Sequence, residues 1–369
     1  MINFSNRLTK LKDRRQGTAE RNRLEKGFTA IGADIRTSES YESLKESDAI
    51  RYVVGSMAPV SPESTRISVE EGERVANTLI ELLNTEGIST TKRMQGSVAL
   101  DIHIEGHSDV DMLILKEDII TYETPAIDSS MYSPASDPRS MVDMVKEIRI
   151  ESERKLTSRY YAANVDCSGS KSIALSGGSL RRKVDIVPSS WYDTLDYQRT
   201  RQESDRTVRI YHKDNHQLLD NKPFLHIKNV NDRDAQYNGN LKKAVRLMKN
   251  LVADMPDYKK SKAKKLSSYD LTGIAYAMDK SLDCNPYLPL ALLENLRSYL
   301  LILLASEVLR DLLEVPDKTR KIFNEESKVE ALSILAVEVN ELALEVQKSL
   351  RPLATTYDSS VLNNKVVVW

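Results

Sequence analysis

The segment SDVDMLIL, residues 108–115, follows a Gly-Ser pair at residues 96–97 and determines which fold is expected for this chain. Alternate residues of a β-strand point to the same face, so Asp109 and Asp111 share one face while Val110 between them enters the core. Two carboxylates side by side can hold Mg²⁺, a cation that prefers oxygen ligands. The segment therefore predicts a metal site at the start of a buried strand.

A second segment, RRKVDIVP at residues 181–188, supplies a third acid, Asp185, on a strand face that also carries Lys183. Two divalent cations about 3.5–4 Å apart can bind both the attacking and the leaving oxygen of a phosphoryl transfer. Asp109 and Asp111 would bridge both cations. Asp185 would serve the cation that binds the nucleophilic hydroxyl, and it would help to remove the hydroxyl proton.

The Gly-Ser pair adds a place for phosphate. Gly96 allows the backbone to approach a phosphate closely, and Ser97 offers a hydroxyl and an N–H group. An Asp-X-Asp segment also occurs on exposed strands and in Ca²⁺ loops of the EF-hand kind. Such a loop needs further oxygen ligands, a glycine and a closing glutamate, whereas these acids run straight into apolar residues. The context favours the metal-bound triphosphate interpretation.

The motifs together resemble the DNA polymerase β-like nucleotidyltransferases. Within that superfamily they are similar to the CD-NTase group, the bacterial relatives of cyclic GMP-AMP synthase and 2′-5′ oligoadenylate synthetase. The resemblance covers about residues 45–280, and its specificity comes from the combination of motifs. The segments that carry it are residues 49–52, 56–60, 73–77, 95–97, 108–111, 184–188, 241–249 and 266–269.

The resemblance implies an α+β fold: a polymerase β-like nucleotidyltransferase core, with a mixed sheet flanked by helices, and a C-terminal helical-bundle lobe. The active site would lie in the cleft between the two. The expected division is a leading helical segment at residues 1–48, the catalytic core at residues 49–224 and the helical lobe at residues 225–369. The length of 369 residues agrees with two core-bearing lobes.

The resemblance also implies roles for individual residues. Asp109, Asp111 and Asp185 would be catalytic and would coordinate two Mg²⁺ ions, with Mn²⁺ as a possible substitute. Lys249 and Ser268 would meet the terminal phosphates, and Tyr269 would lie near the donor base. The nucleotide-binding residues expected are Gly96, Ser97, Lys183, Lys249, Ser268 and Tyr269.

One segment departs from the family pattern. Members usually carry Gly-Thr or a similar small pair between the Gly-Ser turn and the two acids, where this chain has DIHI at residues 101–104. The change from small residues to Asp101 and Ile102 would reshape the phosphate loop or the acceptor pocket. His103 and His107 are expected to be ordinary loop histidines, because Mg²⁺ selects oxygen ligands.

The function implied is metal-dependent joining of nucleoside triphosphates into a cyclic or linear oligonucleotide second messenger, with release of pyrophosphate, in bacterial antiphage signalling. A downstream effector would receive the product, and a regulatory protein is a further expected partner. Two alternatives remain open. The same acids serve nucleotide transfer to a tRNA 3′ end or a protein, and the fold also suits a non-catalytic nucleotide-binding regulator.

The composition of the chain limits which binding partners and sites are expected. With 53 basic and 54 acidic residues the formal net charge is −1, so no global cationic field exists to hold DNA constitutively. The two cysteines, Cys167 and Cys284, form no C-x-x-C pair and suggest neither a disulfide framework nor a zinc site. No signal peptide and no stretch of about 20 apolar residues is recognisable, so a cytoplasmic protein without a membrane partner is expected.

Helical periodicity predicts several further elements. Residues 6–31 suggest an exposed leading helix with solvated basic residues. Residues 68–84 read as a helix that begins with a capping box of Ser68 and Glu71.

From about residue 225 onward the periodicity is helical. Residues 240–252 place Arg246 on the face opposite the apolar one, and residues 326–350 form a late amphipathic helix. The cationic run at residues 259–265 is expected to be a solvated loop or a helix start, with attraction of triphosphates or an RNA-like activator as the alternative.

Overall fold

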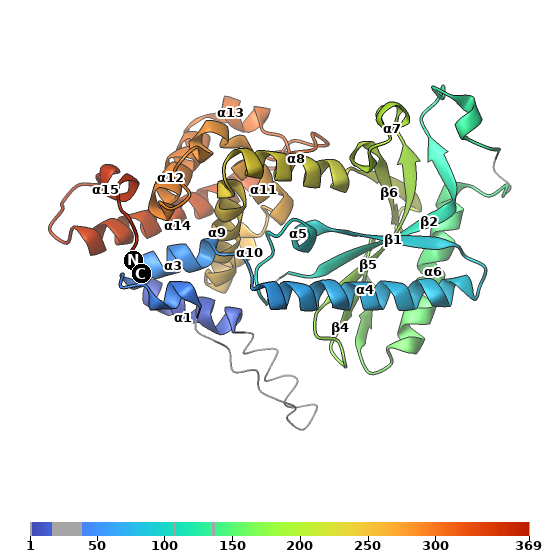
Figure 1. Ribbon diagram of the computed structural model, residues 1–369, viewed down its shortest axis with the longest axis horizontal. Helices are drawn as coiled ribbons and strands as arrows, with labels where there is room; N and C mark the ends of the chain where they lie inside the picture. Colours follow the sequence, from blue (N-terminus) through green and yellow to red (C-terminus); the bar gives the residue numbers. More distant parts are fainter. Residues whose placement is uncertain (1, 17–38, 107, 135–136, 369) are drawn as a thin grey trace. The chain divides into compact units, whose positions relative to one another are not determined.

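The computed structural model describes residues 2–16, 39–106, 108–134 and 137–368 (Figure 1). Contacts divide the chain into two compact units. The sheet unit contains Ser61–Leu100 and Ser108–Asn229, and the helical unit contains Met1–Val60, Asp101–His107 and Val230–Trp369. This grouping differs from the boundaries expected from the sequence, because residues 49–60 and the connection 101–106 pack with the helical unit.

The sheet unit is built on a seven-stranded mixed sheet, which confirms the expected architecture. The strands are β1 (Thr90–Gln95), β2 (Val110–Tyr122), β3 (Asn164–Asp166), β4 (Ile173–Ser176), β5 (Val184–Asp193), β6 (Thr207–His212) and β7 (Gln217–Asn221). Their order is β1-β2-β5-β4-β3, while β6 pairs with the later half of β5 and β7 pairs with β6. Only β2 and β5 run parallel among the strands described; the other pairs are antiparallel.

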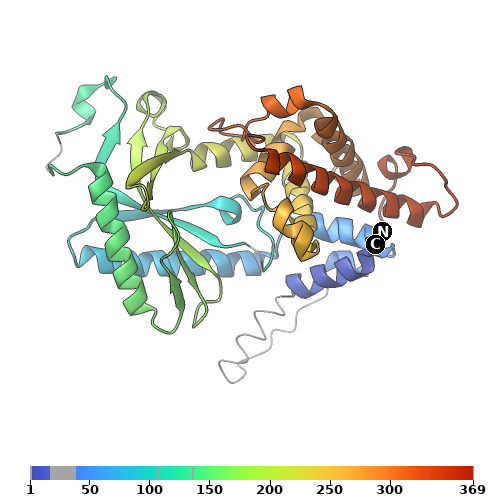
Figure 2. The same ribbon diagram turned by 180° about the vertical axis from the view of Figure 1, so that it is seen from behind.

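Two long helices cover one face of this sheet, as Figures 1 and 2 show. The helical elements of the sheet unit are α4 (Pro62–Asn84), α5 (Gly96–Ala99), η2 (Ser129–Met131), α6 (Met141–Arg159), α7 (Leu195–Thr200) and η3 (Glu203–Asp205). Helix α8 (Pro223–Gln236) begins in this unit and continues into the helical unit. The long covering helices are α4 and α6.

Helix α4 begins earlier than its periodicity predicts. Ser61 is the N-cap, its side chain accepts from the Ser64 N–H, and Pro62 occupies the first helical position, where no N–H is needed. Ser68 lies inside the helix and donates to the Ser64 carbonyl. The capping box of Ser68 and Glu71 is therefore wrong, since the stronger start signal, Ser61 and Pro62, lies about two turns upstream.

The core beneath α4 and α6 fixes the orientation of β2. Val110, Met112 and Ile114 are fully buried in this core. Gly72 of α4 permits the close approach, because a Cβ there would lie 2.6 Å from Val110 Cγ1. Leu113 belongs to a separate core on the other face of the sheet, together with Trp191. Side chains of β2 thus alternate between two cores. The β2 residues on the same face as Leu113 point away from α4.

The helical unit is formed mainly by the ends of the chain. Its elements are α1 (Phe4–Arg15), η1 (Ser40–Ser43), α3 (Asp48–Met57), α9 (Asn240–Asp254), α10 (Asp257–Ala263), α11 (Ser268–Ala277), η4 (Asp279–Leu282), α12 (Pro289–Ala305), α13 (Glu307–Leu312), α14 (Glu326–Leu350) and α15 (Ser360–Asn363). Helix α3 packs against α1 and α9, which explains why it joins this unit. The expected helix at residues 326–350 is confirmed, with Leu332, Leu335 and Val339 buried.

Charged side chains expected in solvent are instead buried in the helical unit. Helix α1 ends at Arg15, and Arg7 and Arg15 are 5% and 7% exposed, so the exposed leading helix is wrong within the described residues. The rest of the expected segment, including residues 17–31, lies outside them. Arg246 is also buried, and it donates to the carbonyls of Met57 and Asp101. These arginines donate hydrogen bonds to backbone carbonyls and carboxylates. The sequence pattern does not predict which groups these acceptors are.

The cationic run at residues 259–265 is largely helical, because α10 covers most of it. Lys259 forms an ion pair with the fully buried Glu338, and Lys262 forms an exposed ion pair with Glu330. Among the described helices, none combines the length and the apolar character needed to cross a bilayer.

Glu338 is the clearest electrostatic determinant of stability in the helical unit. Its side chain is 0% exposed, and its carboxylate accepts from Arg7 at 2.5 Å and from Lys259 at 3.1 Å. Glu338→Gln would leave the Arg7 guanidinium buried without a counter-charge. We expect a loss of about 3–5 kcal/mol in the free energy of unfolding, measured by circular dichroism during denaturation.

The matched control is Glu330→Gln, which breaks the exposed pair with Lys262. That change should cost less than about 1 kcal/mol. Equal destabilisation by the two substitutions would contradict a special role for the buried carboxylate.

Candidate active site

The expected acids meet where the two parallel strands begin. Asp111 of β2 lies directly opposite Asp185 of β5 in the strand register. Asp109 and Lys183 each come one residue before the Val110–Val184 pair. They form an ion pair, with Lys183 Nζ 3.1 Å from Asp109 Oδ2. The Val110 N–H donates to the Lys183 carbonyl at 3.0 Å, so the backbone holds the two chains together at this point. Three carboxylates and one ammonium group thus lie within two residues of one another along these strands, with the Val110–Val184 pair between them.

These side chains lie on the face of the sheet turned away from α4 and α6. Val110 and Met112, which alternate with the acids, are fully buried under those helices. The sequence prediction that the acids share a face with apolar residues behind them is therefore consistent with the structure. Lys183 accompanies Asp185, as its spacing of two residues predicts.

The environment of Asp185 disfavours the ionised carboxylate and so raises its pKa above the usual value of an aspartate. Burial raises the pKa of Asp185, the negative charge of Asp109 raises it further, and Lys183 and a hydrogen bond from Ser172 oppose the shift. Its Oδ1 atom is buried and has no hydrogen-bond partner within the described part of the chain. Buried carboxylate oxygens of native proteins are normally paired, so this atom is suited to receiving a proton or binding a cation.

Lys183 carries a firmly held positive charge. Burial lowers the pKa of its ammonium group, but the hydrogen bond with Asp109 and the charges of Asp109, Asp185 and Asp166 outweigh burial, so the pKa is raised overall. The ammonium therefore stays protonated at neutral pH, close to three carboxylates.

The Gly-Ser turn lies against the acids. Gln95, the last residue of β1, pairs with Asp111, and the chain then turns into the short helix α5. Gly96 has φ +78°, and a Cβ at this position would lie 2.2 Å from Asp111 Oδ2. Both the left-handed backbone and the lack of space require glycine here.

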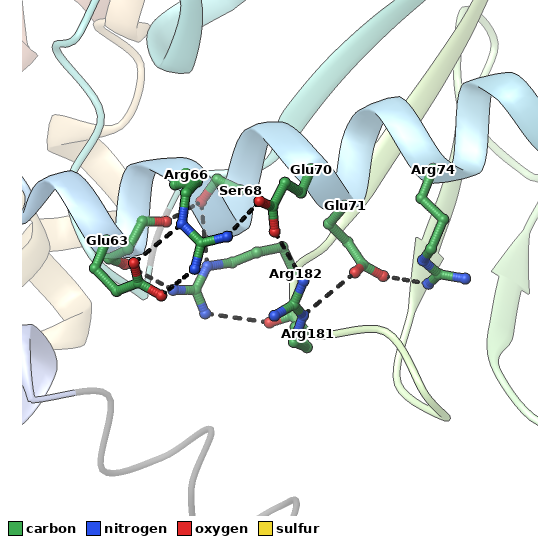
Figure 3. Close-up of polar contacts among 9 residues, drawn as sticks. Glu63, Arg66, Ser68, Glu70, Glu71, Arg74, Arg181 and Arg182 are labelled. Carbon is green, nitrogen blue, oxygen red and sulfur yellow. Dashed lines mark hydrogen bonds and ion pairs between the residues drawn. The ribbon is translucent and has the colours of Figure 1, made fainter. Parts of the chain in front are cut away.

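A cluster of polar contacts ties the segment before β5 to helix α4 (Figure 3). Arg182 donates to the hydroxyl oxygens of Ser64 and Ser68 at 2.7 and 3.2 Å. Arg181 lies 3.7 Å from the buried carboxylate of Glu71. The residues just before Lys183 are thus fixed on α4, which limits how far the start of β5 can move.

The remaining expected nucleotide contacts lie in the helical unit. Lys249 is a half-buried residue of α9, and Ser268 is the exposed first residue of α11. The Tyr269 hydroxyl donates to Asp317, and burial together with that carboxylate raises the pKa of the phenol. The structure therefore brings Gly96, Asp109, Asp111, Lys183 and Asp185 together in one unit, with Ser97 in the adjoining α5, and places the other three residues in the second unit.

The segment that departs from the family pattern is packed in the helical unit. Asp101 has φ +54°, its carbonyl accepts from Arg246 at 2.6 Å, and Ile102 is buried. His103 is buried as well, whereas His107 lies outside the described residues. The change from small residues thus supplies apolar side chains to a core.

Comparison with known proteins identifies the family. Residues 228–334 match the cGAS/DncV-like nucleotidyltransferase C-terminal helical domain. A protein of Yersinia aleksiciae named cyclic dinucleotide synthase CdnE is 37% identical over 96% of this chain and 95% of its own length. The chain belongs to the CD-NTase family. The predicted family, fold class and nucleotidyltransferase activity that yields an oligonucleotide second messenger are confirmed.

Other CD-NTases agree with this assignment. A c-di-GMP synthase of Lachnospiraceae bacterium strain RUG226 is 28% identical and aligns with 65% of this chain and 72% of its own length. The solved structure of a STING-associated CdnE c-di-GMP synthase from Capnocytophaga granulosa superposes with a TM-score of 0.70 at 28% identity. It covers 94% of this chain and 99% of that one.

The acids suit the divalent metals that CD-NTases generally use. Carboxylate oxygens are the ligands that Mg²⁺ prefers, and the buried Oδ1 atom of Asp185 offers an oxygen with no protein partner among the described groups. As the side chains stand, no set of three or more His, Cys, Asp or Glu residues in the described ranges is gathered for a metal ion. Asp109 is paired with Lys183 instead.

Sequence reasoning missed several residues around the acids. Asp166 of β3 lies in the same row as Asp185, with Ala174 of β4 between them. Its charge raises the pKa of Asp185, and Ser172 opposes that shift. In the sequence, Arg182 is only the middle one of three successive basic residues, Arg181, Arg182 and Lys183. No sequence signal marks these residues, because their importance comes from strand register and from contact with α4.

Gly96→Ala should slow nucleotidyl transfer about a hundredfold while the protein stays folded. The added Cβ displaces the Asp111 carboxylate, and a misplacement of about 1 Å at a reacting centre costs on the order of a hundredfold in rate. Pyrophosphate release provides the measurement.

Gly87→Ala is the matched control. Gly87 also has a positive φ, +75°, but a Cβ there meets nothing within 4 Å. It should share the backbone strain, of about 1–2 kcal/mol, and keep the activity. Equal activity in the two variants would show that Gly96 is not needed for the placement of Asp111.

Proposed function

We propose that this chain makes a cyclic dinucleotide from two nucleoside triphosphates, with GTP as a substrate. The observation that carries the proposal is the register that sets Asp111 opposite Asp185, with Asp109 and Gly96 beside them. The names of its relatives, a cyclic dinucleotide synthase and two c-di-GMP synthases, support the class of product and the choice of guanine.

Asp109, Asp111 and Asp185 would hold two divalent cations, Mg²⁺ or Mn²⁺. When bound, such cations neutralise charge on the transferring phosphoryl group and favour ionisation of the attacking hydroxyl. The protein's own contribution is placement. The β2–β5 register fixes Asp111 and Asp185, and the Arg182 contacts to α4 hold the start of β5 in place.

Asp185 would accept the proton of the attacking ribose hydroxyl. Its raised pKa brings the carboxylate closer to the basicity that proton transfer needs. The hydroxyl oxygen bonds to the α-phosphorus while the bond from that phosphorus to the β-phosphate oxygen breaks, and pyrophosphate leaves. A second round between the two joined nucleotides closes the ring and releases a second pyrophosphate.

The triphosphate would be bound by the residues that the family resemblance assigns to it. Gly96 and Ser97 would approach it through the backbone and a hydroxyl, and Lys249 and Ser268 would contact the terminal phosphates. Tyr269 would meet the donor base through its ring, since its hydroxyl already donates to Asp317. Aromatic rings stack on any base, so base choice requires other side chains.

The product would act on a separate effector. The description of the Capnocytophaga granulosa synthase as STING-associated supports an effector that recognises a cyclic dinucleotide. A role in antiphage signalling, a regulatory protein partner and a cytoplasmic location stay predictions.

The product assay tests the proposal directly. Purified protein with Mg²⁺ or Mn²⁺ and the four nucleoside triphosphates, singly and mixed, should yield a phosphatase-resistant compound with the mass of a guanine-containing cyclic dinucleotide. Two pyrophosphates should appear for each ring. Label retained on RNA or protein would favour transfer to a macromolecule, and absence of any nucleotide product under all conditions would reject synthesis.

Replacing Asp185 tests the site separately from the product. Asp185→Asn keeps the shape but removes the proton acceptor and a proposed cation ligand, so kcat should fall about a thousandfold or more. Asp166→Asn is the matched control, because Asp166 lies in the same row but is exposed and two strands away. Comparable losses in both variants would point to general charge and not to a specific role of Asp185.

A further inference from the structure

The ion pair between Lys183 and Asp109 occupies one of the three proposed cation ligands. Lys183 Nζ lies 3.1 Å from Asp109 Oδ2, and the two side chains are 50% and 34% exposed. The pair lies two residues before Asp111 and Asp185, which are two like charges directly opposite each other. Like charges in such cross-strand positions repel, so a positive group nearby relieves the repulsion.

The backbone of Lys183 is anchored, whereas its side chain is half-exposed and reaches Asp109. Its carbonyl accepts from the Val110 N–H, and the preceding Arg182 is anchored on Ser64 and Ser68 of α4. The flexible stem of a lysine still allows the ammonium to leave Asp109 without any change in the strands. A half-exposed ion pair is weak, of the order of 0–1 kcal/mol, so leaving costs little.

We propose that Lys183 is a resident counter-cation that holds Asp109 until the metal-bound nucleotide arrives and then moves to the triphosphate. This inference rests on the proposed function, because it takes Asp109 as a cation ligand. A divalent cation on Asp109 repels the ammonium at close range, while the triphosphate that enters with it attracts the ammonium. Lys183 therefore neutralises Asp109 first and contacts phosphate second.

The competing explanation is a structural ion pair that only joins β2 to β5. The two explanations differ in what happens when the lysine is removed. A counter-cation competes with metal, so its loss should tighten metal binding in the absence of nucleotide. A structural pair positions Asp109 productively, so its loss should weaken metal binding or leave it unchanged.

Binding of Mn²⁺ alone, measured by electron paramagnetic resonance of the free ion, separates these outcomes without any need for turnover. Lys183→Met should bind Mn²⁺ about three- to tenfold more tightly than the unmodified protein, which corresponds to loss of one tethered competitor and its charge. Lys183→Arg, which keeps the charge, should stay close to the unmodified protein. In steady-state assays Lys183→Met should need less metal but show a higher KM for the nucleotide.

Lys92→Met is the matched control. Lys92 forms an ion pair with Glu73 of α4, and it lies in β1, two residues before Met94, which packs against the core beneath α4. Its removal deletes the same charge from the same sheet on the opposite face, and Mn²⁺ binding should not change. In an Asp109→Asn background, the further change Lys183→Met should likewise lose most of its effect.

Equal or weaker Mn²⁺ binding by a folded Lys183→Met protein would overturn the proposal, as would no binding by either protein in the millimolar range. Thermal unfolding of each variant checks the fold, and Lys183→Gln provides a second replacement if methionine misfolds. Failure of the product assay together with tighter Mn²⁺ binding would reject the cyclic dinucleotide and leave the role of Lys183 standing. Product formation without tighter binding would reject only the role of Lys183.

Discussion

The parallel pairing of β2 with β5 is the constraint on which the rest of the site depends. Hydrogen bonds along these strands place Asp111 opposite Asp185 and bring Asp109 to Lys183. Buried side chains of β2 on both faces prevent a shift in register, because a slip of one residue would send the acids into the core beneath α4 and α6. The charges are thus held together by apolar packing and not by their own attraction.

The carboxylates of Asp109 and Asp185 repel each other, and a bound cation or proton would relieve that repulsion. Burial and the charge of Asp109 both disfavour the ionised form of Asp185, and its Oδ1 atom has no hydrogen-bond partner in the described part of the chain. A protein optimised only for stability would pair or remove this group. In the proposed mechanism the same features would prepare the carboxylate for a proton or a cation, and the surrounding core supplies the stability that the site lacks.

In the helical unit, by contrast, the buried charged groups are paired with protein partners. Glu338 is buried but bonded to Arg7 and Lys259, and Arg246 donates to two backbone carbonyls. Charged groups that are paired in this manner join segments distant in the chain. Arg246 also holds Asp101, so the segment that departs from the family pattern is part of the packing of this unit. Its apolar residues are buried for that reason.

The sequence by itself determined the family, the mixed sheet with its helical partner, and the candidate residues Gly96, Asp109, Asp111 and Asp185. These follow from short-range patterns: alternation along a strand, a glycine before the acids and periodic apolar residues in helices. Only the tertiary structure decided the pairing of Lys183 with Asp109, the contacts of Arg182 with α4 and the burial of Arg7 and Arg246. Each of these joins residues far apart in the chain, and a charged residue looks the same in sequence whether its partner is water or a distant carboxylate.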